Sequence, residues 1–145
     1  MSESFAGMRI AIYARYSSAL QRETSIEDQV CRCAEYVRKR GGQVNEKLVF
    51  ADAAISGASL DRPGFEQLMR LVEAKARGVD AIVTEDMSRI SRDFADSAQL
   101  FKRVQYVGVP IIGVADGIDT GAASAKLTFT VKSLLSDIYR DDLAD

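Results

Sequence analysis

The residues best suited to chemistry in this sequence are one serine and four arginines that occur where predicted strands end. Arg15 and Ser17 are two positions apart, so an extended backbone points both side chains to the same face. Arg62, Arg89 and Arg92 follow in later segments that are rich in hydroxyl and acidic residues. The planar guanidinium fits phosphate oxygens, and a serine Oγ beside a held phosphate is suited to phosphoryl transfer.

Each of these residues also has an ordinary structural explanation. A single arginine could be a solvated loop residue or a salt-bridge partner of Asp61, Asp86 or Asp93. Ser17 could be a turn or capping hydroxyl, and the neighbouring Ser18 points to the opposite face of the strand. The functional interpretation therefore depends on whether the fold brings the arginines together.

The apolar pattern predicts strands that alternate with helices. Strands are expected at 9–15, 44–52, 79–85 and 109–116, and helices at 26–40, 62–78, 94–108 and 126–145. This alternation indicates an α/β fold with an open, mostly parallel sheet of four or five strands and flanking helices. The predicted division is a flexible leader at 1–7, one domain at 8–125, and the start of a longer C-terminal helix at 126–145.

Right-handed crossovers place every strand-to-helix loop at one edge of such a sheet, and open α/β sheets bind ligands at that edge. The sequence therefore predicts one site built from the loops that follow the strands. The polar residues in these loops are Arg15, Ser17, Ser18, Gln21, Asp52, Ser56, Arg62, Glu85, Asp86, Ser88, Arg89, Ser91, Arg92, Asp116 and Asp119.

Composition narrows the chemistry further. The 145 residues include no histidine, which excludes a Ser-His-Asp triad and disfavours an ordinary zinc site. A net charge of -2 implies that, if DNA is the partner, most of the binding surface lies elsewhere. The sequence has neither a signal peptide nor an apolar run long enough for a membrane span, which predicts a cytoplasmic protein.

Four stretches carry a resemblance to a known family: "IYARYSSALQRETSIEDQ", "FADAAISGASLDRPGF", "DMSRISRDFAD" and "GVADGIDT". With them the chain resembles the N-terminal catalytic domain of the serine recombinases, the resolvase and invertase family, and more closely its large integrase and transposon-type branch. The resemblance implies that Ser17 attacks a DNA phosphodiester and forms a 5′-phosphoserine intermediate, without a metal, ATP or another cofactor. It implies partners too: DNA, held mainly by a C-terminal region, and further copies of the chain in a dimer and a synaptic tetramer, with 126–145 as the helix of association.

The resemblance assigns the other site residues by their positions in these stretches. It implies that Arg15, Arg62, Arg89 and Arg92 contact the phosphate. The supporting positions that it implies are Tyr13, Gln21, Gln29, Asp52, Ser56 and Ser88. Ser88 stands where many members have aspartate, and Glu85 and Asp86 stand where many have lysine.

Two alternatives of a different class remain open at this point. The chain could be a non-enzymatic α/β domain that binds a phosphate or nucleotide. It could also be a magnesium-dependent receiver-like module that uses Asp52, Glu85 and Asp86, although that alternative leaves the arginines unexplained.

Overall fold

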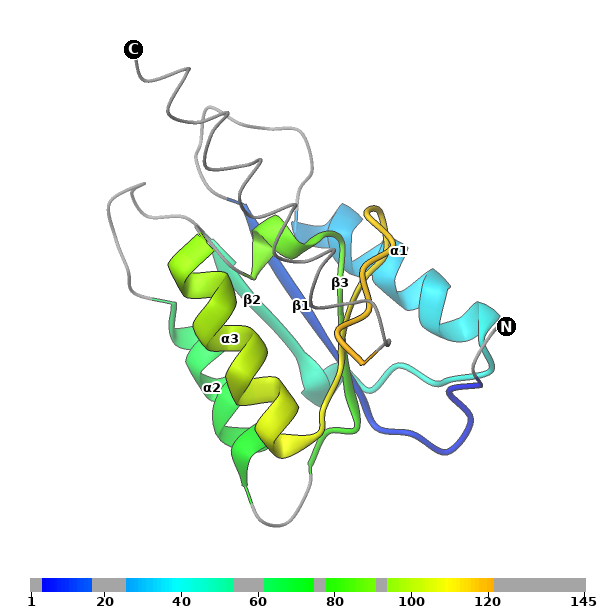
Figure 1. The fold of residues 1–145 in the computed structure, drawn as a ribbon. Helices are drawn as coiled ribbons and strands as arrows, with labels where there is room; N and C mark the ends of the chain where they lie inside the picture. The colour runs from blue at the N-terminus through cyan, green and yellow to red at the C-terminus, as the bar shows by residue number, and fades with distance from the viewer. Residues whose placement is uncertain (1–3, 17–25, 54–61, 75–77, 91–93, 122–145) are drawn as a thin grey trace.

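A computed structural model describes residues 4–16, 26–53, 62–74, 78–90 and 94–121 of the chain. Strands and helices alternate along these ranges, as the apolar pattern predicts (Figure 1). The elements are β1 (Ile10–Tyr16), α1 (Ile26–Lys39), the 3-10 turn η1 (Glu46–Leu48), β2 (Val49–Ala53), α2 (Pro63–Glu73), β3 (Ala81–Thr84), the 3-10 turn η2 (Met87–Arg89), α3 (Phe94–Val107) and β4 (Ile111–Gly113).

Within the described ranges, these strands form one four-stranded parallel sheet in the order β2-β1-β3-β4. The predicted parallel α/β architecture is thereby confirmed. In the register, Arg15 of β1 lies opposite Asp52 of β2, and Tyr13 of β1 lies opposite Thr84 of β3. The carboxyl ends of the three strands therefore meet at one edge of the sheet.

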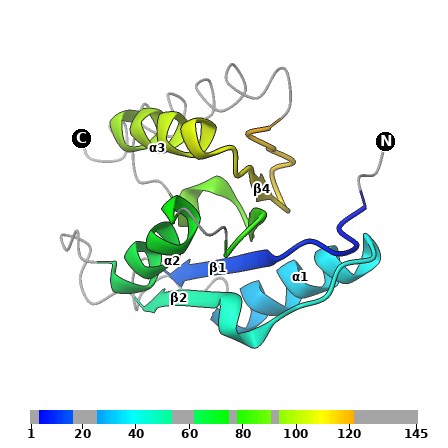
Figure 2. The same ribbon diagram turned by 90° about the horizontal axis from the view of Figure 1, so that it is seen from below.

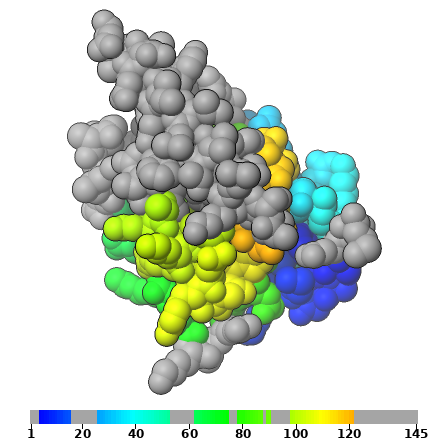
Figure 3. Space-filling view, viewed as in Figure 1, coloured from blue at the N-terminus to red at the C-terminus, as the bar shows by residue number. Residues whose placement is uncertain are grey.

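Helices cover both faces of the sheet (Figures 1 and 2). Alternate residues of β1 point to opposite faces, so Ile10 and Ile12 pack toward α1 while Ala11 and Tyr13 pack toward α2 and α3. In the space-filling view, the layer of α2 and α3 forms the left of the visible surface and the N-terminal segment lies at the right (Figure 3). Both faces are thus buried, as the continuous apolar runs of parallel strands require.

The structure differs from the sequence expectations at several boundaries. The second strand begins at Val49, because Asn45 accepts a hydrogen bond from the Lys47 N–H at 2.9 Å and starts the turn η1 instead. Helix α2 ends at Glu73 rather than at residue 78. Phe5, in the segment expected to be a leader, is 3% exposed and packs against Tyr36.

Two further expectations concern the predicted C-terminal helix and membrane-spanning segments. The helix predicted at 126–145 lies outside the described residues. Among the residues that the structure describes, no helix is both long enough and apolar enough to cross a membrane.

Candidate active site

Gln29 of α1 holds the end of β1 in place. Its side-chain oxygen accepts a hydrogen bond from the Arg15 backbone N–H at 3.0 Å, and its amide nitrogen donates to the Arg15 carbonyl, also at 3.0 Å. Gln29 is fully buried, so water does not compete for these bonds. The Gln29 amide thus bonds to both the N–H and the carbonyl of Arg15, as the backbone of a neighbouring strand would. It fixes the backbone at Arg15, two residues before Ser17.

Arg15 and Arg89 are joined through each other's backbone. Nε of Arg15 donates to the carbonyl oxygen of Arg89 at 2.9 Å, and Nη1 of Arg89 donates to the carbonyl oxygen of Arg15 at 3.1 Å. The tip of β1 and the turn η2 are therefore tied together by two arginines. Because each guanidinium binds a neutral carbonyl here, these two bonds hold the arginines without cancelling their charge.

Glu85 supplies a buried carboxylate beside Arg89. One of its oxygens accepts from Nη2 of Arg89 at 3.3 Å, and the other accepts from Nη1 of Arg32 at 3.0 Å. A buried carboxylate is stable only when it is paired and hydrogen-bonded, which both arginines achieve. Asp86 lies farther away, with its Oδ2 at 3.9 Å from Nε of Arg89.

Asp52 joins β1 to the start of α2. Its Oδ2 accepts from the Tyr13 hydroxyl at 2.6 Å and from the Phe65 N–H at 2.9 Å, while Oδ1 accepts from the Gly64 N–H at 2.8 Å. These N–H groups belong to the first turn of α2, where a negative charge is favourable. Burial, and then the hydrogen bond to Asp52, raise the pKa of Tyr13 well above its usual range, so its hydroxyl stays a donor.

Arg62 lies immediately before α2, at the N-cap position, and its side chain makes no capping hydrogen bond to the helix. Its Nη1 donates to the carbonyl oxygen of Ile90, and its guanidinium lies 4.6 Å from the centre of the Phe65 ring. The bonds from Asp52 to the first turn of α2 therefore also fix the position of Arg62. Arg62 and Arg15 both reach the backbone at the end of η2, on residues 90 and 89.

The turn η2 is itself held by the segment that follows β4. Oδ2 of Asp116 accepts from the Met87 N–H at 2.9 Å, and the Ala115 N–H donates to the Glu85 carbonyl at 2.7 Å. Thr84 adds a buried hydroxyl that donates to the Tyr13 carbonyl at 2.9 Å. The edge predicted from topology is thus a connected network, with Arg15, Arg62 and Arg89 fixed to backbone groups.

Six of the site residues that the resemblance implies have described side chains at this edge: Tyr13, Arg15, Gln29, Asp52, Arg62 and Arg89. Ser17, Gln21, Ser56 and Arg92 lie outside the described residues, and of Ser88 only the backbone in η2 is described. Sequence reasoning missed Arg32 and Thr84. The available signal for Arg32 was Glu85, an acidic residue at the end of an apolar predicted strand, which needs a cationic partner when it is buried.

The acidic residues of the receiver-like alternative have other roles here. Asp52 binds the start of α2, and Glu85 pairs with two arginines. In the part of the chain that the structure describes, no three acidic or cysteine side chains are grouped so as to hold a metal ion. The described carboxylates of Asp52 and Glu85 are thus engaged with backbone N–H groups, the Tyr13 hydroxyl and arginines.

Comparison with known proteins agrees with this geometry. The family model "Resolvase, N terminal domain" matches residues 10–145. The transposon Tn3 resolvase of Escherichia coli is 32% identical over 133 residues, which are 92% of this chain and 64% of that protein. The R46 site-specific recombinase of Escherichia coli is also 32% identical, over 92% of this chain and 63% of its own length. The chain thus spans somewhat less than two thirds of these relatives.

Solved structures show the same fold. The N-terminal catalytic domain of TP901-1 integrase superposes with a TM-score of 0.70 at 30% identity, covering 92% of this chain and 97% of that one. A resolvase family site-specific recombinase from Streptococcus pneumoniae gives a TM-score of 0.71 at 28% identity, covering 94% and 91%. Together with the family match, these similarities show that the chain belongs to the serine recombinases and carries the resolvase N-terminal domain.

Proposed function

We propose that this chain is the catalytic domain of a DNA recombinase in which Ser17 is the nucleophile. The observation that carries the proposal is the convergence of Arg15, Arg62 and Arg89 at the carboxyl ends of β1, β2 and β3. Ser17 follows Arg15 by two positions, so extension of β1 would point its side chain to the face that carries Arg15. A phosphate among these arginines would then lie within reach of the serine.

The reaction is an exchange of phosphate esters. The Ser17 Oγ bonds to phosphorus, the bond from phosphorus to the 3′ oxygen breaks, and the serine proton passes, directly or through water, to that oxygen. The products are a 5′-phosphoserine link and a free 3′-hydroxyl, and the reverse reaction with another 3′-hydroxyl rejoins DNA. Because one phosphate ester replaces another, no ATP is consumed. The arginines stabilise the charge of the transition state, a task that a metal ion would otherwise perform.

The remaining site residues receive supporting roles in this proposal. Arg92 is a fourth phosphate contact, while Gln21, Ser56 and Ser88 line the site beside it. The segment 126–145 begins a helix through which copies of the chain associate into a dimer and a synaptic tetramer. The net charge of -2 supports the view that a region other than this domain provides most of the DNA contacts.

Trapping the intermediate tests the proposal. The full-length protein is incubated with DNA of its source organism and denatured rapidly, and the covalently attached DNA is sequenced to define the cleavage site. Mass spectrometry of the attached peptide is expected to find phosphate on Ser17. Ser17→Ala should abolish the adduct, while the matched variant Ser18→Ala should still form it. An adduct on another residue, or tight binding of a nucleotide without any adduct, would overturn the proposal.

A further inference from the structure

Glu85 is placed to control the orientation of Arg89. Its side chain is only 7% exposed, and its two carboxylate oxygens separately contact Arg89 and Arg32. The backbone beneath it is rigid, because the Glu85 carbonyl accepts from the Ala115 N–H at 2.7 Å and the Thr84 carbonyl accepts from the Val114 N–H at 2.9 Å. The carboxylate thus stands on a fixed extension of β3.

Arg89 is held at both ends of its guanidinium. Nη2 binds Glu85, and Nη1 binds the Arg15 carbonyl on β1. Nε is buried and makes no hydrogen bond among the described residues; its ion-pair contact with Oδ2 of Asp86 is longer, at 3.9 Å, so the orientation of the group depends mainly on its two terminal nitrogens. Loss of the bond to Glu85 would leave the guanidinium with one hydrogen bond, to the Arg15 carbonyl, and the longer contact with Asp86, so its orientation would be less well fixed.

Arg32 gives the carboxylate a second partner outside the site. It comes from α1, and its side chain is 57% exposed, whereas that of Arg89 is 15% exposed. Arg32 therefore offsets part of the negative charge of Glu85 from the solvent side. Arg89, on the inner side of the carboxylate, is thus the partner that Glu85 orients within the site.

We propose that Glu85 is a positioning residue for the cleavage reaction: it fixes the guanidinium of Arg89 for its contact with the scissile phosphate, and Arg32 acts only through it. This inference rests on the proposed function. Replacement by glutamine keeps the shape and one acceptor oxygen but removes the charge, and a charge-assisted hydrogen bond is roughly twice as strong as a neutral one.

The first test needs no DNA and uses the 145-residue chain. In nitrogen-15 NMR at low temperature, the terminal N–H groups of Arg89 in the wild type should give separate signals, because both ends are held. Glu85→Gln should speed their exchange about 10-fold, as expected when a charge-assisted bond becomes a neutral one. Freely averaged Arg89 signals in the wild type would overturn the inference, even if the variant failed to fold.

The second test measures cleavage of the duplex recovered from the trapped adduct. Glu85→Gln should lower the single-turnover rate at saturating DNA about 10- to 100-fold, the cost of a misplaced group, with DNA affinity unchanged within about twofold. Arg32→Ala should lower the rate by no more than about fivefold, because the Arg32 side chain is 57% exposed and solvent screens its charge. The double variant should match Glu85→Gln alone, since Arg32 acts through Glu85. Additive effects would contradict this linkage.

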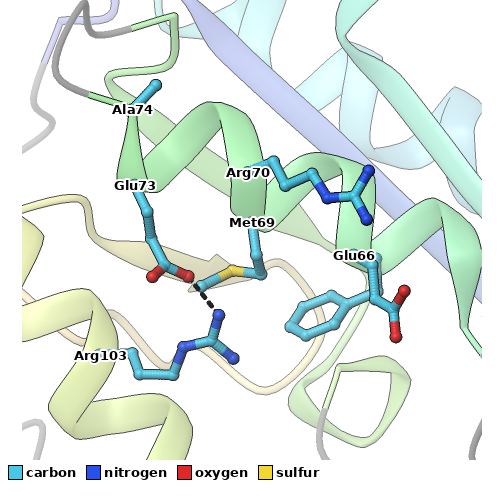
Figure 4. Close-up of a pocket in the computed structure, with 7 residues that line it drawn as sticks. Glu66, Met69, Arg70, Glu73, Ala74 and Arg103 are labelled. Carbon is cyan, nitrogen blue, oxygen red and sulfur yellow. Dashed lines mark hydrogen bonds and ion pairs between the residues drawn. The ribbon is translucent and has the colours of Figure 1, made fainter.

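A matched control comes from a second carboxylate–arginine pair. Glu73 and Arg103 form an ion pair across the pocket between α2 and α3, at the end of α2 remote from Arg62 (Figure 4). Both are substantially exposed, at 42% and 49%. Glu73→Gln should leave the rate unchanged. If the wild type forms no adduct, the proposed function fails; if it cleaves DNA and Glu85→Gln cleaves equally fast, only the present inference fails.

Discussion

Arg15 and Arg89 each donate a hydrogen bond to the other's backbone carbonyl, at 2.9 Å and 3.1 Å. Their side chains thereby lie at one edge of the sheet, where Arg15 comes from the strand β1 and Arg89 from the turn η2. Their positive charges repel each other, and the Glu85 carboxylate beside Arg89 offsets part of that repulsion. Under the proposed function, we expect a bound phosphate to contact both guanidinium groups.

We therefore expect that lysine cannot substitute for either arginine in the cleavage reaction. Arg15→Lys and Arg89→Lys keep the charge but lose the planar fork that binds a carbonyl and a phosphate oxygen together. We expect each to lower the single-turnover cleavage rate by about 10²- to 10³-fold, the usual cost of one lost transition-state donor. Arg38→Lys, on the exposed face of α1, serves as the control and should cleave at the normal rate. Full activity of both site variants would show that point charges suffice.

The gathering of Arg15, Arg62 and Arg89 could be predicted from sequence because it follows from local patterns. Each arginine lies at or after the end of a predicted strand, and the apolar residues of that strand identify it in the sequence. The parallel topology then brings the carboxyl ends of all the strands to one edge of the sheet. The partners of these arginines could not be predicted in this way. They include the backbone carbonyls of residues 15, 89 and 90, whose positions depend on how η2 packs against β1.

Gln29 should contribute to stability through the backbone of Arg15. Gln29→Met keeps the length of the side chain but leaves the Arg15 N–H without its buried acceptor. We expect the free energy of unfolding to fall by about 1–3 kcal/mol, measured by urea denaturation. Cys31→Ala, at an exposed position of the same helix, should change it little. An unchanged stability in Gln29→Met would mean that water replaces the amide at the tip of β1.

Gly64 should be intolerant of a side chain for a steric reason. A Cβ at this position would lie 2.6 Å from the carbonyl oxygen of Ala51, so α2 would have to move away from β2. That movement also stretches the bonds from Asp52 to the first turn of the helix. We expect Gly64→Ala to lower the free energy of unfolding by about 1–3 kcal/mol. Thermal melts should show Gly78→Ala to be harmless, because among the described residues a Cβ there would meet only Leu71, at an ordinary 3.6 Å.

Tertiary contacts explain where the sequence expectations failed. The apolar pattern of 44–52 is typical of a strand, but the side chain of Asn45 captures the Lys47 N–H and turns the chain before β2 begins. Glu85 looked like a loop acid or a metal ligand, whereas its carboxylate is buried between arginines from α1 and η2. Both outcomes depend on hydrogen bonds that periodicity does not encode.

The Tyr13–Asp52 pair should make stability depend on pH in the alkaline range. The pKa of Tyr13 is raised in the folded protein, first by burial and then by Asp52, whereas an unfolded tyrosine titrates near pH 10. Folding therefore favours the protonated hydroxyl. The contribution of Tyr13 to the free energy of unfolding is complete below about pH 10. It is lost as the pH rises further, by up to about 1.4 kcal/mol per pH unit.

Tyr13→Phe tests this contribution directly. At pH 7 the variant should be less stable by about 1–2 kcal/mol, because it lacks the hydrogen bond to the Asp52 carboxylate. Above about pH 10 the free energy of unfolding of the wild type falls, because folding keeps the Tyr13 hydroxyl protonated, whereas the variant has no such group. The difference in the free energy of unfolding between the two proteins should therefore narrow. Urea denaturation at pH 7, 9, 10 and 11 measures it, with Tyr106→Phe, at a position 92% exposed, as the control. The pKa of the buried Cys33 thiol is raised to about 12, which lowers the stability of both proteins equally at alkaline pH. This effect therefore cancels when the two free energies of unfolding are compared. A difference that stays constant from pH 7 to pH 11 would show that Tyr13 ionises as easily in the folded protein as in the unfolded chain.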